Sequence, residues 1–231
     1  ILDTPSEKYP QGYTLKSKYP TEGTLVRVII MGGVAGGMSA ATRLRRLDEH
    51  AEIVIFERGP HVSFANCGLP YALGGVIKER QSLLLQTPES LAQRFDLDVR
   101  VNREVLSIDR EAQEILVANT LSGETRIEPY DALIHSPNVT PVELSSDDSV
   151  PVRALHTVPE LDSMLATLRT APGAPVVVAG AGFIGLEVAE NLVHRGVRVT
   201  LVQRSPQVLA PLDPEMAALL TDRLRDNGVD L

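Results

Sequence analysis

Residues 25–47, LVRVIIMGGVAGGMSAATRLRRL, join a β-branched run to a glycine-rich turn and then to small and apolar residues at helical spacing. The run at 25–31 predicts a buried parallel strand, and the segment 38–47 predicts a helix that packs on it. Residues 51–57, AEIVIFE, predict a second strand that ends in an acid. Together these elements predict a βαβ unit of the kind that binds dinucleotides.

A second stretch repeats this pattern near the other end of the chain. Residues 176–193, VVVAGAGFIGLEVAENLV, again run from strand to glycine turn to helix, and residues 197–202 predict the closing strand. Between the two units, strands are expected at 99–101, 104–108, 114–117 and 125–128, the last two as an antiparallel hairpin or meander, and 130–135 returns to the first sheet. The predicted fold class is α/β, with two Rossmann-like units in a three-layer fold and a small antiparallel meander.

The two glycine turns are the expected phosphate-binding elements. A turn of this kind lets the backbone approach a pyrophosphate, whose charge the N–H groups and dipole of the helix N-terminus stabilise. Gly180, Gly182 and Gly185 fill every glycine position of G-x-G-x-x-G, whereas Val34 stands at the middle position of the first loop. The first loop contributes Gly32, Gly33, Val34, Ala35, Gly36 and Gly37 as expected cofactor-binding residues.

The residue that ends the second strand of each unit differs in charge. Glu57 can accept hydrogen bonds from a ribose, and Arg58 follows it. The second unit has Gln203 and Arg204 at the corresponding place, a pair that can accommodate a 2′-phosphate. NADPH is therefore at least as suitable as NADH, although a simply solvated Arg204 remains an equal alternative.

Cys67 is the one cysteine of the 231 residues, in the segment 62–71, VSFANCGLPY. Pro70 suits the first turn of a helix, which would put the thiol near a helix N-terminus, where the dipole favours the thiolate. From residue type and spacing alone, an inert buried cysteine remains the more common outcome.

Composition excludes several classes of protein. A hydrophobic content of 43% and a formal net charge of −8 fit a globular chain, and they argue against nucleic-acid binding. No apolar run approaches the ~20 residues of a membrane helix, so no membrane partner is expected. No metal site is expected, and a lone cysteine is typical of the reducing cytoplasm. Residues 1–24 are expected to form a linker or flexible arm, and residues 143–150 a polar connector.

The segment SFANCGLPY at 63–71, with both glycine loops in order, resembles the pyridine nucleotide-disulfide oxidoreductases over residues 25–231. Within them the chain is similar to the single-cysteine branch of coenzyme A-disulfide reductases, persulfide and polysulfide reductases and NADH oxidases. The resemblance implies an FAD-binding domain at 25–142 and an NAD(P)-binding domain at 150–231. It also implies that the chain stops partway through the second domain, and that the full-length parent is a homodimer.

The resemblance further implies roles for particular residues. Electrons would pass from NAD(P)H through FAD to Cys67, which forms a mixed disulfide with coenzyme A or, in the oxidase and peroxidase members, a sulfenic acid. Ser63 and Asn66 would line the thiol pocket, and Arg43 and Arg46 would bind coenzyme A phosphates unless they are merely solvated. Cofactor contacts would also come from Val105, Phe183, Ile184 and Glu187.

One departure concerns the segment HSPN at 135–138, where relatives usually have Ser-Pro-Gly. Asn138 therefore replaces a glycine beside the flavin, and asparagine tolerates a positive φ better than most residues. The alternatives that remain are an oxidase that uses oxygen or peroxide, and a catalytically silent dinucleotide-binding fragment.

Overall fold

The first sheet is the predicted βαβ unit, extended by one strand on each side. The computed structural model describes residues 25–141 and 150–231, so the expected arm at 1–24 and most of the expected connector lie outside the described residues. Strand β1 (Arg27–Met31) pairs in parallel with β2 (Glu52–Phe56) and with β7 (Ala132–His135), and β2 pairs with β3 (Asp98–Arg100). The order is β3-β2-β1-β7, so residues 130–135 do return to the first sheet, as predicted.

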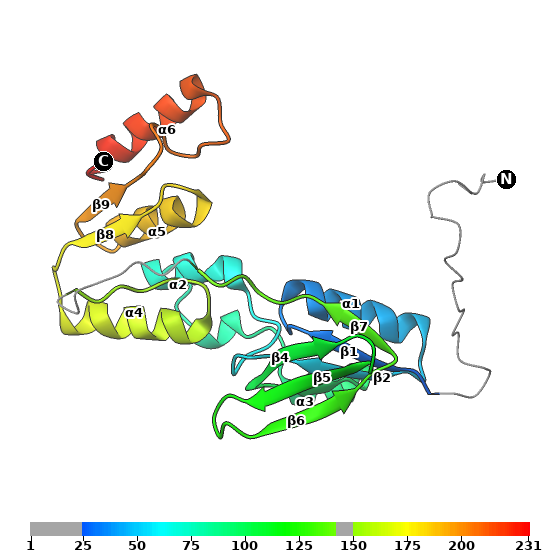
Figure 1. Cartoon of the computed structure of the whole chain (residues 1–231). Coiled ribbons are helices and arrows are strands. Elements are labelled where there is room, and N and C mark those ends of the chain that lie inside the picture. Colours follow the sequence, from blue (N-terminus) through cyan, green and yellow to red (C-terminus); the bar gives the residue numbers. More distant parts are fainter. Residues whose placement is uncertain (1–24, 142–149) are drawn as a thin grey trace, which may run out of the picture.

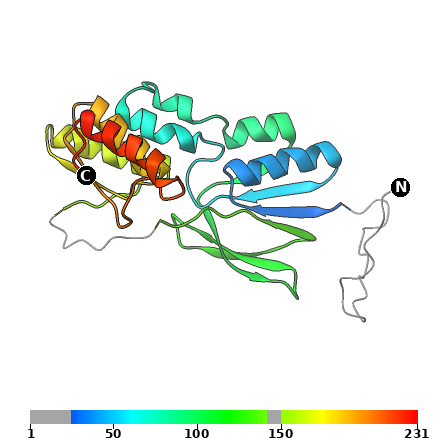
Figure 2. The same ribbon diagram turned by 90° about the horizontal axis from the view of Figure 1, so that it is seen from above.

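Both faces of this sheet are buried, which explains why its strands are continuously apolar. On one face, α1 (Ala35–Leu47) and α3 (Pro88–Phe95) pack through Met38, Ala41 and Leu91. On the other face lies the antiparallel sheet of β4 (Arg103–Asp109), β5 (Glu114–Asn119) and β6 (Thr125–Pro129). Figure 2 shows the three layers as helices, parallel strands and meander. The predicted meander is confirmed as the third layer.

The second unit contains β8 (Val176–Ala179) and β9 (Val199–Val202), which pair in parallel around α5 (Phe183–His194). It is flanked by α4 (Val158–Thr170) and α6 (Pro214–Asp226). The predicted strands and helix of this unit are confirmed, but α3, α4 and α6 were not predicted. Helices α3 and α4 begin with complete capping boxes, at Thr87 with Ser90 and at Thr157 with Glu160, and each has a proline in its first turn.

The segment after the cysteine packs on the second unit rather than on the first sheet. A short 3-10 helix, η1 (Asn66–Gly68), leads into α2 (Leu69–Gly74), and a further one, η2 (Arg80–Leu83), follows. Leu69, Leu73 and Leu83 share one hydrophobic cluster with Leu161 and Leu192. Figure 1 shows α2 beside α4 and α5. The two dinucleotide-type units are therefore joined by a common apolar core at α2.

Candidate functional site

The first glycine loop is held between β1, β2 and the segment that follows β7. Gly32 has a φ of +96° and its N–H donates to the carbonyl oxygen of Phe56 at 2.8 Å. A Cβ at Gly37 would collide with the carbonyl oxygen of Gly32, so only glycine lets α1 start this close to β1. A Cβ at Gly36 would lie 2.6 Å from Oγ of Ser136. A positive φ at Gly32 and two close approaches, at Gly36 and Gly37, therefore explain these glycines.

Glu57 bridges the glycine loop and the turn after β2. Its Oε2 accepts a hydrogen bond of 2.8 Å from the Gly33 N–H, and its Oε1 accepts one of 2.8 Å from the Gly59 N–H. Two backbone donors therefore fix the carboxylate at the carboxyl end of β2. That is where an acid is required to accept hydrogen bonds from a ribose.

An open groove runs along this edge of the first unit. It brings together five predicted cofactor-binding residues, Gly32, Val34, Glu57, Arg58 and Val105. These residues come from the loop after β1, the end of β2 and strand β4. No single sequence motif contains all of them. Their backbone donors, fixed carboxylate and apolar walls suit the adenosine and pyrophosphate of FAD.

The groove also contains residues that sequence reasoning missed. They include Pro60, His61, Phe64, Arg103 and Thr157. Asn138 lies in the groove as well, but it is not among the residues with positive φ. Replacement of a glycine there is therefore compatible with the backbone. The segment 135–138 was singled out in the sequence, whereas His61 and Arg103 carry no local signal.

The cysteine segment is attached directly to the glycine loop. The Ser63 N–H donates to the carbonyl oxygen of Gly33 at 2.8 Å, and the Ser63 carbonyl accepts from the Leu85 N–H at 3.0 Å. Ser63 has a φ of +46°, a left-handed conformation that is uncommon for serine and concentrates at functional sites. Cys67 is exposed, in η1 immediately before α2. The expectation that Cys67 is buried is therefore wrong for this chain, whereas Pro70 does lie in the first turn of a helix, as predicted.

The second glycine loop repeats the construction of the first. Gly180 has a φ of +109° and its N–H donates to the Val202 carbonyl at 2.8 Å, while a Cβ at Gly185 would collide with the Gly180 carbonyl oxygen. A Cβ at Gly182 would meet nothing within 4 Å. The space above Gly182 is therefore open at the start of α5, as a pyrophosphate requires.

Gln203 occupies the place that Glu57 has in the first unit. Its Oε1 accepts a hydrogen bond of 3.1 Å from the Ala181 N–H, and its Nε2 donates to Oγ of Ser205. Arg204 beside it is exposed. A neutral amide thus replaces the carboxylate that would repel a 2′-phosphate.

The remaining predicted contacts lie on α5 and α1. Phe183 and Ile184 are exposed in the first turn of α5, at 70% and 54%, and Glu187 is half-buried one turn later. Arg43 and Arg46 are exposed on α1. By contrast, Arg45 between them is bound to the carbonyl oxygens of Phe95, Asp48, Glu49 and Asp96. Arg43 and Arg46 thus face solvent, as both the coenzyme A-binding role and the merely solvated alternative require.

An ion pair links η2, which follows α2, to α4. The Arg80 guanidinium donates to both carboxylate oxygens of Asp162, at 2.7–3.0 Å. The hydrogen bond from Arg80 lowers the pKa of Asp162, and the same bond raises the pKa of Arg80. Burial, followed by the charge of Arg80, lowers the pKa of His61 in the groove wall, which favours a neutral imidazole.

Comparison with known proteins identifies the family. Residues 26–231 match the family described as pyridine nucleotide-disulphide oxidoreductase. The coenzyme A disulfide reductase of Staphylococcus epidermidis is 37% identical over 205 residues, which cover 88% of this chain and 46% of that protein. The chain therefore spans about half the length of the curated relatives it matches.

Solved structures agree in fold. Reduced Bacillus anthracis CoADR-RHD superposes with a TM-score of 0.87 at 44% identity, covering 90% of this chain and 38% of that one. A NAD-dependent persulfide reductase from A. fulgidus has a TM-score of 0.83 at 31% identity, and the match covers 89% of this chain and 38% of that one. The water-forming NADH oxidase from Lactobacillus brevis bound to NADH has a TM-score of 0.82 at 27% identity, and the match covers 89% of this chain and 46% of that one.

In the part of the chain that the structure describes, no helix is long and apolar enough to cross a membrane. The groove and the paired glycine loops agree with the cofactors of this family, FAD and NAD(P)H. The chain belongs to the pyridine nucleotide-disulphide oxidoreductase family.

Proposed function

We propose that the full-length protein is an FAD-dependent NAD(P)H oxidoreductase that reduces coenzyme A disulfide or per- and polysulfides through Cys67. One observation carries this proposal. The exposed thiol lies four residues after Ser63, whose N–H is hydrogen-bonded to Gly33 of the flavin loop at 2.8 Å. The names of the relatives, a coenzyme A disulfide reductase and a persulfide reductase, support the substrate class.

The residues of the first unit have the chemistry needed to hold FAD. Backbone N–H groups of the loop at 32–37 would bind the pyrophosphate, and Glu57 would bind the ribose. Val105 and Arg58 would line the adenosine end of the groove. FAD, when bound, accepts a hydride from NAD(P)H and supplies the two electrons that the disulfide needs.

Cys67 carries the substrate chemistry. Its thiolate attacks one sulfur of coenzyme A disulfide, the S–S bond breaks, and one coenzyme A leaves as a thiolate while Cys67 forms a mixed disulfide with the other. Two electrons and a proton then cleave the mixed disulfide, release the second coenzyme A thiol and restore the Cys67 thiolate. Asn66 is exposed next to Cys67 and Ser63 is half-buried, positions from which both can line the thiol pocket.

The second unit is proposed to bind the nicotinamide nucleotide and to accept NADPH. Gln203 places no carboxylate beside a 2′-phosphate, and Arg204 is free to pair with one. Gly180, Gly182 and Gly185 would bind the pyrophosphate, while Phe183, Ile184 and Glu187 would contact the nicotinamide end. A second full-length copy is the proposed partner, and the cytoplasm the proposed location.

A second candidate acceptor is oxygen or peroxide, reduced through a Cys67 sulfenic acid. The likeness to a water-forming NADH oxidase favours it, and an exposed thiol is open to this oxidation. The test measures NAD(P)H oxidation by the FAD-loaded full-length protein with coenzyme A disulfide, with polysulfide and with oxygen. Disulfide or polysulfide turnover that exceeds oxygen consumption supports the reductase. Turnover with oxygen alone, lost in Cys67→Ser, replaces it with the oxidase.

A further inference from the structure

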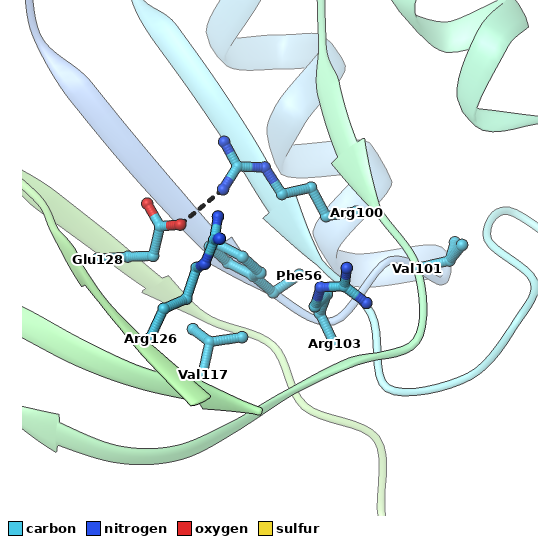
Figure 3. A pocket seen from close by; sticks show the side chains of 7 residues that line it. All are labelled: Phe56, Arg100, Val101, Arg103, Val117, Arg126 and Glu128. Atoms are coloured by element: carbon cyan, nitrogen blue, oxygen red, sulfur yellow. Dashed lines mark hydrogen bonds and ion pairs between the residues drawn. The ribbon is translucent and has the colours of Figure 1, made fainter. Parts of the chain in front are cut away.

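A second hollow, lined by three arginines, lies where the parallel sheet meets the meander. Its volume is about 230 Å³ and its lining comes from five strands and a loop residue: Phe56, Arg100, Val101, Arg103, Val117, Arg126 and Glu128. Figure 3 shows the side chains of Arg100, Arg103 and Arg126 arranged around the Phe56 ring. None of the three arginines belongs to either dinucleotide motif.

Glu128 cannot neutralise all of these charges. It is buried at 7% exposure, with its Oε1 bound to Arg100 Nη1 at 2.7 Å and its Oε2 bound to Arg27 Nη2 at 2.6 Å. Both carboxylate oxygens are therefore taken by other guanidinium groups. Arg100 is also paired with Asp98 at 2.6 Å. Arg100 and Glu128 thus form a closed ion-pair network that fixes one wall of the hollow.

The other two arginines keep donors for a ligand. Arg103 donates to the Asn102 carbonyl at 3.0 Å and has no acid partner among residues 25–141 and 150–231. Arg126 approaches Glu124 only to 3.9 Å, with both side chains more than 60% exposed (63% and 69%). Such an exposed ion pair contributes little to stability, so Arg126 can exchange Glu124 for a better hydrogen-bond acceptor. Two guanidinium groups on different strands thus face one hollow without a firm counter-charge.

The lining also includes two buried apolar side chains. Phe56 is 3% exposed and Val117 is 1% exposed, and Cζ of Arg100 lies over the Phe56 ring, 5.4 Å from its centroid. A hollow of 230 Å³ lies below the range of drug-sized pockets, which start at about 300 Å³. Guanidinium groups recognise phosphate through paired, charge-assisted hydrogen bonds. We propose that this hollow binds a phosphate group, as the free ion or as a small phosphomonoester.

The hollow adjoins the flavin groove and is distinct from it. Phe56 and Arg103 line both, whereas Arg100, Val117 and Arg126 line only the hollow. The Arg103 N–H donates to the Glu57 carbonyl at 2.9 Å, so Arg103 is fixed next to the groove residue Glu57 while it also lines the hollow. The proposal uses neither Cys67 nor the second unit, and therefore does not rest on the proposed function.

The test is a calorimetric titration of the FAD-loaded full-length protein with inorganic phosphate, against chloride at equal ionic strength. Arg126→Gln is the diagnostic variant because Arg126 lines only this hollow, and Arg110→Gln is the matched control on the turn between β4 and β5, where Arg110 is exposed. Wild type and Arg110→Gln are expected to bind phosphate equally, and Arg126→Gln at least tenfold more weakly. Equal binding in all three proteins, or no binding to the wild type, overturns the proposal.

Two further arms make the result specific. Arg103→Gln, checked by flavin absorbance for retained FAD, is expected to weaken phosphate binding as Arg126→Gln does. Replacing phosphate with succinate distinguishes a phosphate site from a carboxylate site, and tighter binding of succinate overturns the assignment. Because each readout is binding and not turnover, failure here is distinguishable from failure of the proposed reductase activity.

Discussion

The backbone N–H of Ser63 donates a hydrogen bond of 2.8 Å to the carbonyl oxygen of Gly33, which ties the segment that contains Cys67 to the first glycine loop. The N–H of the same glycine donates to Glu57 at 2.8 Å. A Cβ at position 33 would lie 2.7 Å from Cγ1 of Val62, so glycine is required for this approach. Gly33 therefore joins the Glu57 carboxylate to the segment that leads to Cys67.

Replacing Glu57 by glutamine is expected to weaken FAD binding. Both carboxylate oxygens accept backbone hydrogen bonds, but a glutamine amide offers one oxygen and turns its NH₂ towards the other donor. The ribose of FAD would also lose a charged acceptor, and since a hydrogen bond to a charged group contributes about 1.5–3 kcal/mol, FAD affinity should fall about tenfold or more. Fluorescence titration of apoprotein with FAD measures this. Glu111→Gln, on an exposed turn, is the control, and equal affinities would contradict the assignment of Glu57.

Gly185→Ala is expected to lower the stability of the fold, whereas Gly182→Ala is expected to lower the affinity for NAD(P)H. A Cβ at Gly185 would collide with the Gly180 backbone, so Gly185→Ala should destabilise the fold by about 1–3 kcal/mol. A Cβ at Gly182 meets open space and its φ of −82° suits alanine, so Gly182→Ala should keep its stability and lose NAD(P)H affinity. Denaturation and nucleotide binding of both variants check this. Unchanged NAD(P)H affinity in Gly182→Ala would rule out the proposed pyrophosphate site.

Exchanging the residues after β9 is expected to change nucleotide preference. Gln203→Glu puts a carboxylate where a 2′-phosphate would lie, and Arg204→Leu removes the cation beside it. The ratio of kcat/KM for NADPH to that for NADH should fall about tenfold or more in each variant. Arg198→Leu, on the exposed approach to β9, is the control. A ratio that stays constant would show that Arg204 is only solvated.

Asp162→Asn is expected to reduce stability more near neutral pH than in acid. Arg80 lowers the pKa of Asp162 below its ordinary 3.8, so the ion pair stabilises the fold above pH 3.8 and is lost as pH falls through the lowered pKa. Because the side chains are 42% and 41% exposed, the effect should not exceed about 1 kcal/mol. Urea denaturation at pH 6 and pH 3 measures it. Asp222→Asn, in an exposed pair with Arg225, is the control. A difference from wild type that is as large at pH 3 as at pH 6 would contradict this role.

Periodicity and glycine spacing predicted the elements of both βαβ units, since consecutive residues carry that signal. The meander was predicted from its turn and strands for the same reason. Helices α3 and α4 were not predicted, because their sequence signal is a capping box, at Thr87 and at Thr157, and not a glycine turn after a strand.

The site was less predictable because its parts meet only through tertiary packing. Nothing near Arg103 or His61 in the sequence indicates that they reach the groove beside the first glycine loop. Likewise, the packing of α2 on α5 depends on Gly74 and Asn191 meeting, a contact between residues far apart in the chain. The exposure of Cys67 could not be predicted from the sequence either, because cysteine is one of the residue types that are most often buried.

The most direct test of the cysteine relay is anaerobic reduction of the FAD-loaded full-length protein by NAD(P)H, followed by addition of coenzyme A disulfide. Wild type and Cys67→Ser are compared for flavin absorbance and for released thiol. The flavin of both proteins should be reduced by NAD(P)H, but only the wild type should be re-oxidised by the disulfide, with release of coenzyme A thiol. Equal thiol release from Cys67→Ser would contradict the role of Cys67.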